Sequence, residues 1–427
     1  MQQYELSSLP TGERVITEHV PGVRSVALGF WIGAGSRDEA EAQAGVSHFI
    51  EHLLFKGSTT YNAQEIAEIF DGLGGELNAA TSRETTVVYA RVPDDKLELA
   101  VDVMADMVFR PAFAEVDAER EVVLEEIAMV EDNPQDLVHD YVAEAVFGGH
   151  PLGRPVIGTA EVIARVTPEE IAGYHRAAYV SENVVVAAAG NLTHERLLEL
   201  LAKSRGGDPE PHRVPRLLLG APPPAGRRFQ RKDTEQYHVC LGAPGIARAD
   251  ERRFAASLLD AILGGSASSR LFQEIREKRG MAYAVYSFGS QYTDSGQLGI
   301  YVGTREENLA ACLEIAAAQL ADVAGGNVRV EELSRAKENL KGRMLLSLES
   351  TSNRMSRLGK SLITGTELLS AEALIERIDR VEATEVAALA AELLAPERLS
   401  AAGIGPDEER FREAVARVNP ALYADAA

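Results

Sequence analysis

The sequence has few cysteines, few aromatic residues and no long apolar run. Only two of its 427 residues are cysteines, Cys240 and Cys312, and their spacing fits neither a metal motif nor a disulfide framework. We therefore expect both to be small core residues in a reducing compartment. No apolar run reaches the length of a membrane span, and the first residues lack the basic and apolar regions of a signal peptide. These features together predict a cytoplasmic protein.

Basic residues are also in deficit, since 43 Lys and Arg stand against 65 Asp and Glu and give a formal net charge of −22. Such a charge disfavours nucleic acid and anionic membranes as partners. It would favour a basic peptide if it lined a cavity, but a generally solubilising acidic surface explains it equally well. The apolar content of 45% is that of a globular protein, and the length is sufficient for about two to four domains.

One apolar stretch, residues 45–57, carries three ionisable side chains. Its periodicity predicts a helix of about three turns. His48 and His52 are four residues apart and so project from one face, with Glu51 at the edge of that face. Two imidazoles at this spacing can hold one zinc ion, and a neighbouring carboxylate can take a proton from a zinc-bound water. The order His-x-x-Glu-His is the inverted-zincin signature.

An ordinary solvated helix face would also explain two histidines and a glutamate at this spacing. The flanking residues argue against that alternative, because Phe49, Ile50, Leu53, Leu54 and Phe55 make the helix mostly apolar. A buried helix needs a reason to carry three ionisable groups, and a bound metal ion supplies one.

A second predicted helix, from about residue 115 to 132, offers the third protein ligand that a zinc ion needs. Glu119 and Glu126 fall at the edge of its apolar face, whereas Glu121 and Glu125 fall towards solvent. A carboxylate at the apolar edge is costly unless it is paired or bound to metal. We therefore predict Glu126 as the third zinc ligand, with Glu119 as a carboxylate that supports the first ligand shell.

The order of strands and helices occurs twice along the chain, on either side of a stretch rich in proline and glycine. We predict a first domain at 1–204, a linker at 205–228 and a homologous second domain at 229–427. The second copy has no His-x-x-Glu-His, and its corresponding helix, residues 254–263, carries Asp260 as its one ionisable group. One metal ion is therefore expected per chain.

The second copy has polar residues of its own. A glycine and serine loop at 264–269 precedes a helix, an arrangement that can bind phosphate, but it lacks the Walker lysine and the Rossmann spacing. Arg276 and Tyr283 follow, seven residues apart. From the residues alone, a surface arginine and a strand tyrosine explain this pair as well as a site does.

These motifs resemble those of the insulinase/pitrilysin-type inverted-zincin metallopeptidases, and most of all the short-chain branch with the mitochondrial processing peptidase β subunit and its bacterial relatives. Residues 45–57 are similar to the family's metal helix, 119–126 to its third-ligand helix and 271–283 to a motif of its second domain. The resemblance implies zinc held by His48, His52 and Glu126. It also implies Glu119 as an assisting catalytic carboxylate.

The resemblance extends to fold, substrate and assembly. It implies an α+β chain with two homologous domains, each a mainly antiparallel sheet packed with helices. It implies that Arg276 and Tyr283 reach the substrate, and that Asn78 and Ala79 lie on an edge strand that pairs with extended peptide. Family members of this size close as two chains around a chamber. Because this chain carries both the zinc motif and the Arg/Tyr motif, we expect a homodimer.

The predicted function is that of a zinc-dependent endopeptidase that cleaves peptides or unfolded protein segments inside an enclosed chamber, with Glu51 as general base. Two alternatives stay open. One is a non-catalytic assembly subunit of the same fold, and the other is a protease that is active only with a different partner chain.

Overall fold

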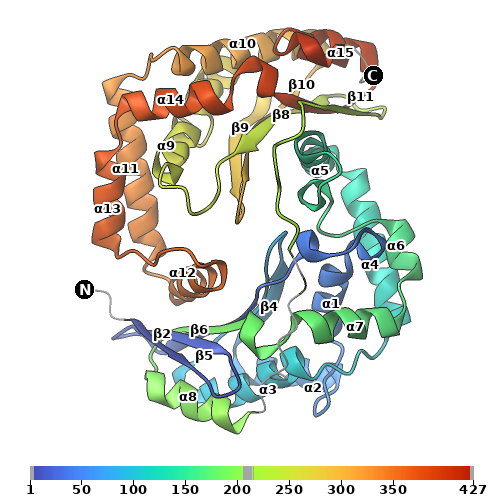
Figure 1. The fold of residues 1–427 in the computed structure, drawn as a ribbon, viewed down its shortest axis with the longest axis vertical. Coiled ribbons are helices and arrows are strands. Elements are labelled where there is room, and N and C mark those ends of the chain that lie inside the picture. The colour runs from blue at the N-terminus through green and yellow to red at the C-terminus, as the bar shows by residue number, and fades with distance from the viewer. Residues whose placement is uncertain (1–3, 205–213, 215, 424–427) are drawn as a thin grey trace. The chain divides into compact units, whose positions relative to one another are not determined.

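The computed structural model describes residues 4–204, 214 and 216–423, which form two compact units (Figure 1). The first unit takes in Met1–Ala128, Pro155–Leu217 and Met344–Ala371. The second takes in Met129–Arg154, Leu218–Arg343 and Glu372–Ala427. Each unit contains one sheet packed with helices, which confirms the predicted α+β fold with two domains.

The sheet of the first unit has six strands: β1 (Tyr4–Ser8), β2 (Arg14–His19), β3 (Ser25–Ile32), β4 (Glu76–Thr81), β5 (Thr86–Pro93) and β6 (Val184–Gly190). Their order is β1-β2-β6-β3-β5-β4, so β4 is an edge strand. All neighbours are antiparallel except β2 and β6, which run parallel. Strand β6 consists of valine, alanine and a final glycine and is buried along its whole length, as expected of a central strand covered on both faces.

The helices of the first unit supply those two layers. They are α1 (Val46–Leu54), α2 (Ala63–Leu73), α3 (Leu97–Phe109), most of α4 (Val116–Asp132), α6 (Ala160–Arg165), α7 (Pro168–Ala178), α8 (His194–Lys203) and α12 (Thr351–Thr364). Alternate residues of β3 point to opposite faces of the sheet. Leu28 and Phe30 therefore pack in the core that contains α1 and α3, whereas Ala27 and Trp31 pack in a separate core with Met355 of α12.

The sheet of the second unit has five strands: β7 (Arg227–Arg231), β8 (Tyr237–Gly245), β9 (Ala282–Gln291), β10 (Gly296–Thr304) and β11 (Ser400–Gly405). Their order is β7-β11-β8-β10-β9, with β7 and β11 parallel and the other neighbours antiparallel. Its helices are α5 (Pro134–Phe147), α9 (Arg253–Leu263), α10 (Glu306–Ala324), most of α11 (Val330–Ser347), α13 (Ala371–Arg380), α14 (Ala383–Leu393) and α15 (Glu408–Ala416).

The two sheets share one topology. The order β2-β6-β3-β5-β4 in the first unit corresponds to β7-β11-β8-β10-β9 in the second, and the one parallel pair of each described sheet falls at the same place. The two domains are therefore homologous, as the repeated sequence pattern predicted. The helix that corresponds to the predicted metal helix is α9, which starts at Arg253, so it contains that arginine besides Asp260.

The compact units do not follow the linear boundaries predicted at 1–204 and 229–427. Helix α12, far beyond the linker, packs on β3 and β6 of the first unit, and α5, which precedes the linker, packs on β8 and β11 of the second. In each sheet, one apolar face is thus covered by a helix that comes from the other half of the sequence. Of the predicted linker, residues 205–213 and 215 lie outside the described residues, and the final two positions already belong to β7.

None of the helices in the described part of the chain is both long enough and apolar enough to cross a lipid bilayer.

Close packing of α12 against the first sheet depends on a glycine. Gly359 lies on the buried face of α12, where a Cβ atom would overlap the indole ring of Trp31. Gly342, in α11, has nothing within 4 Å of the position that its Cβ would take. The two glycines have the same helix propensity but opposite surroundings.

Replacement of these glycines by alanine should therefore shift stability in opposite directions. Gly359→Ala should lower the free energy of unfolding by about 1–3 kcal/mol through overpacking against Trp31. Gly342→Ala should raise it by up to about 1 kcal/mol, the usual gain of alanine over glycine inside a helix. Urea unfolding of the two variants measures both effects, and equal effects of the two substitutions would contradict the packing argument.

Candidate metal centre

Helix α1 is fixed at its first turn by a carboxylate. The backbone amides of Gly45 and Ser47 donate to the two oxygens of Glu39, at 2.7 and 2.8 Å. Gly45 has φ +95°, and a Cβ there would collide with the carbonyl oxygen of Ile157, so this position requires glycine. The apolar face that α1 buries consists of Val46, Phe49, Ile50, Leu53 and Leu54. Helix α1 is a little shorter than the predicted three turns.

The structure brings the three predicted metal ligands together within the first unit. Oε2 of Glu126, on α4, lies 3.7 Å from Nε2 of His48 and 3.3 Å from Nε2 of His52. One potential ligand atom from each of the three residues lies within 4.8 Å of the other two. Within residues 4–204, 214 and 216–423, no other set of three His, Cys, Asp or Glu side chains meets this criterion. Two imidazoles and a carboxylate form a donor set that zinc takes in catalytic sites, with a fourth position left open.

The environment of His48 suits a metal ligand. Burial, together with the neighbouring His52, lowers the pKa of His48 to about 4, so its imidazole is neutral at neutral pH and keeps a lone pair for a metal ion. Its Nδ1 is buried and has no hydrogen-bond partner among the described residues. Its Nε2 is the nitrogen that faces Glu126.

Glu51 lies on α1 between the two histidines in sequence and contacts the edge strand β4. The hydroxyl of Thr81, the last residue of β4, donates a hydrogen bond to Oε2 of Glu51. Burial raises the pKa of the Glu51 carboxyl, and the hydrogen bond from Thr81 and the nearby His52 oppose that rise. A positioned carboxylate with a raised pKa is a better proton acceptor than an exposed one.

Glu119 lies about two turns before Glu126 in the same helix, α4, and it contacts the imidazole of His52. Its Oε1 lies 2.9 Å from Nδ1 of His52, on the other side of the imidazole from Glu126. Its Oε2 lies 2.7 Å from Nζ of Lys56. The sequence pattern pointed to Glu119 but not to Lys56, which lies just beyond the end of α1 and meets Glu119 of another helix.

The residues predicted to bind substrate lie on different units. Asn78 and Ala79 belong to β4, which pairs on one side with β5 and is the last strand of its sheet. Arg276 and Tyr283 belong to the second unit, where the guanidinium of Arg276 lies 4.4 Å from the centre of the Tyr283 ring and 4.6 Å from that of Phe272. The side chain of Tyr283 is exposed. Their action on a substrate stays a prediction.

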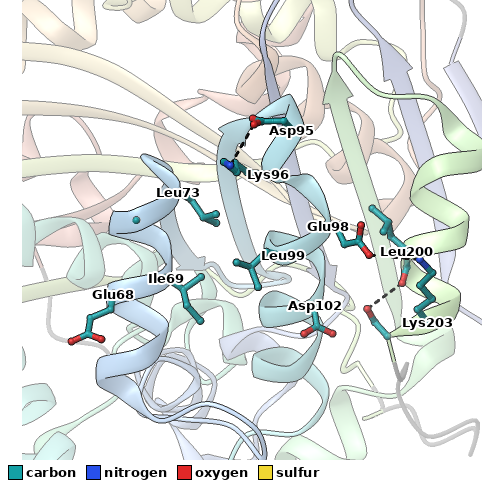
Figure 2. Close-up of a pocket in the computed structure, with 12 residues that line it drawn as sticks. Glu68, Ile69, Leu73, Asp95, Lys96, Glu98, Leu99, Asp102, Leu200 and Lys203 are labelled. Carbon is teal, nitrogen blue, oxygen red and sulfur yellow. Dashed lines mark hydrogen bonds and ion pairs between the residues drawn. The ribbon is translucent and has the colours of Figure 1, made fainter.

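A hollow of about 700 Å³ lies between α2, α3 and α8 of the first unit (Figure 2). Its apolar lining is flanked by charged side chains, some of which pair with each other, such as Lys203 with Glu98 at 3.6 Å. None of the predicted site residues lines it. The hollow is therefore separate from the candidate metal centre.

Comparisons with known proteins point to one family over most of the chain. The family model described as Insulinase (Peptidase family M16) matches residues 14–160, and the model described as Peptidase M16 inactive domain matches residues 165–340. A Mycobacterium leprae protein named "uncharacterized zinc protease" is 44% identical over 411 residues, which cover 94% of this chain and 91% of that protein. A Bacillus subtilis protein with a name of the same kind is 40% identical over 394 residues, covering 90% and 93%.

Solved structures share the fold. A structure described as a protease from Helicobacter pylori aligns with a TM-score of 0.89 at 22% identity and covers 95% of this chain and all of its own. A structure described as a peptidase M16 inactive domain from Pseudomonas fluorescens aligns with a TM-score of 0.87 at 24% identity, covering 95% and 98%. At these identities the likeness concerns the fold.

If Glu126 is a zinc ligand, its replacement should lower the affinity of the protein for zinc. Glu126→Gln should weaken Zn²⁺ binding by more than the roughly 10–100-fold that loss of an outer-shell partner costs, because an amide replaces a charged ligand. Glu125→Gln is the matched control, since Glu125 is the neighbouring residue on the same helix and is exposed. Competition between the metal-free protein and a fluorescent chelator measures both affinities. Equal affinities for the two variants would remove Glu126 from the ligand set.

The low pKa of His48 makes a prediction about acid stability of the metal-free protein. Between pH 6.5 and about 4 the unfolded chain binds a proton at His48 that the folded chain does not. The unfolded state therefore holds more protons in this window, and the free energy of unfolding should fall as the pH decreases through it. Urea unfolding in the presence of a chelator should show a smaller fall for His48→Gln than for the wild type, and an equal fall for the two proteins would contradict the argument.

Proposed function

The chain belongs to the insulinase family of peptidases, family M16, and we propose that it is a zinc-dependent endopeptidase that cleaves peptides or unfolded protein segments. One observation carries the proposal: His48, His52 and Glu126 converge within a single compact unit, and the carboxylate of Glu51 lies near enough to interact electrostatically with His52 and Glu126. The relatives named zinc proteases align over nearly their whole length with this chain, which supports the same chemistry here.

His48, His52 and Glu126 would hold the zinc ion, which when bound supplies Lewis-acid chemistry that polarises the scissile carbonyl and makes water more acidic. Glu51 acts as the general base: it takes a proton from the attacking water and then delivers it to the leaving amine. The hydroxyl of Thr81 donates to one oxygen of Glu51 and thereby orients the carboxylate for this transfer.

The edge strand β4 is the proposed binding site for the main chain of the substrate. An extended peptide would pair with the side of β4 that β5 does not occupy, near Asn78 and Ala79. Thr81, two residues further along the same strand, is the residue that contacts Glu51. A peptide paired with β4 would therefore pass beside the proposed base.

Assembly and location complete the proposal. Arg276 and Tyr283 would help to hold the substrate or stabilise the developing oxyanion. We propose a homodimer around an enclosed chamber, on the ground that one chain carries both the metal motif and the Arg/Tyr motif. We also place the protein in the cytoplasm. Cys240 and Cys312, both buried free thiols, support a reducing compartment.

Peptide cleavage tests the role of Glu51. Glu51→Gln should cleave a mixture of unfolded peptides about 10²–10⁴-fold more slowly than the wild type, because general-base catalysis is lost, while zinc content stays equal. Glu125→Gln should cleave at the wild-type rate. If Glu51→Gln with its zinc bound is as fast as the wild type, the mechanism is wrong.

The same assay on the chain expressed alone decides between the alternatives for assembly. A protein that binds zinc and cleaves peptide without any added chain needs no different partner, and its mass in solution then reports whether it is a homodimer. A protein that takes up no zinc on titration would instead be a non-catalytic subunit of this fold.

A further inference from the structure

Lys56 contacts Glu119, which is not one of the three proposed zinc ligands but lies next to one of them, His52. We propose that it is a positioning residue for zinc, acting through Glu119 on the imidazole of His52. The inference rests on the proposed function, because it concerns the same metal centre. It adds a residue to which neither the family comparisons nor the motif His-x-x-Glu-His assigns a task.

The contacts form a chain of three side chains. Nζ of Lys56 lies 2.7 Å from Oε2 of Glu119, and Oε1 of Glu119 lies 2.9 Å from Nδ1 of His52. The two end members come from one segment, since Lys56 follows the last turn of α1, and the middle member comes from α4. The carboxylate of Glu119 therefore bridges a histidine and a lysine that are four residues apart.

Burial explains why Glu119 needs this lysine. Glu119 is only 5% exposed, and a carboxylate in such a place is costly unless a cation or several hydrogen bonds compensate it. Lys56 is the cation in contact with it. The ammonium group of Lys56 forms an ion pair with Oε2 of Glu119, while Oε1 faces His52. The orientation of the whole carboxylate therefore depends on Lys56.

The orientation of Glu119 in turn fixes the metal-binding nitrogen of His52. With its proton on Nδ1, the imidazole donates to Oε1 of Glu119 and presents the lone pair of Nε2 on the opposite side. That side is where Oε2 of Glu126 lies, 3.3 Å away. Carboxylates that hold a metal-binding histidine in this way typically contribute about 10–100-fold to metal affinity.

The two histidines of the centre differ in this respect. Nδ1 of His48 has no hydrogen-bond partner among the described residues, so no carboxylate holds that ring at Nδ1. His52 is thus the histidine of α1 whose orientation depends on a neighbouring carboxylate, that of Glu119. The effect of Lys56 on the metal must therefore pass through Glu119 and His52, and removal of Glu119 must abolish it.

A double-mutant cycle on zinc affinity tests this coupling without reference to peptide cleavage. The full-length chain is stripped of metal, and the dissociation constant for Zn²⁺ is measured by competition with a fluorescent chelator. The variants are Lys56→Met, Lys56→Arg, Glu119→Gln and the double variant Lys56→Met with Glu119→Gln. Lys96→Met, at an exposed lysine of the same unit, is the control. Thermal unfolding of each metal-free variant shows that it is folded.

We expect Lys56→Met to weaken zinc binding by about tenfold and Glu119→Gln by about 10–100-fold. In the Glu119→Gln background, Lys56→Met should cause no further loss, because the residue through which it acts is gone. Lys56→Arg should restore most of the affinity, since it keeps the positive charge, and Lys96→Met should leave the affinity unchanged. Should Lys56→Met fail to fold, Lys56→Gln replaces it in both backgrounds, because its amide is polar but carries no positive charge.

Two results would overturn the inference. One is an unchanged zinc affinity of folded Lys56→Met, and the other is an equal loss in the wild-type and Glu119→Gln backgrounds. Either result would leave the proposed function intact, because the wild type would still bind zinc. If the wild type itself binds no zinc, the proposed function and this inference both fail.

Discussion

The position of helix α1 determines the geometry of the candidate metal centre, and hydrogen bonds from its first turn to Glu39 set that position. The amides at the start of a helix have no partners within the helix, and a negative charge there also suits the helix dipole. Glu39 satisfies two such amides, those of Gly45 and Ser47. Because a helix is rigid, this contact and the burial of the apolar face together decide where His48 and His52 project.

Four acidic residues near α1 take different tasks because their surroundings differ, although all are glutamates. Glu39 caps the helix. Glu51 contacts a hydroxyl on an edge strand and is the proposed general base. Glu119 is buried between a lysine and an imidazole, whereas Glu126 is 42% exposed and faces two imidazole nitrogens. Only the last arrangement brings one carboxylate oxygen close to the imidazole nitrogens of both histidines.

The sequence allowed prediction of those site residues whose relation is local. The spacing of His48 and His52 implies one face of a helix, and the helical wheel separates Glu126 from Glu125; both relations lie within a single element. The contacts of Lys56 with Glu119 and of Thr81 with Glu51 join different elements, so no spacing reveals them. The packing of α12 on the first sheet could not be predicted for the same reason. An amphipathic pattern shows that one face of a helix is buried, but it does not show which sheet covers that face.

The second domain shows which part of the site belongs to the fold itself. There, the hydroxyl of Ser287 on the edge strand β9 donates to Oδ1 of Asp260 on α9, at 2.6 Å. This is the same kind of contact as that of Thr81 with Glu51, and burial raises the pKa of Asp260 as it does that of Glu51. Yet α9 contains no histidine. A carboxylate that fastens this helix to the edge strand is therefore a feature that both domains can carry without a metal ion. In the first domain the same contact becomes part of a candidate catalytic site only because the same helix also carries His48 and His52.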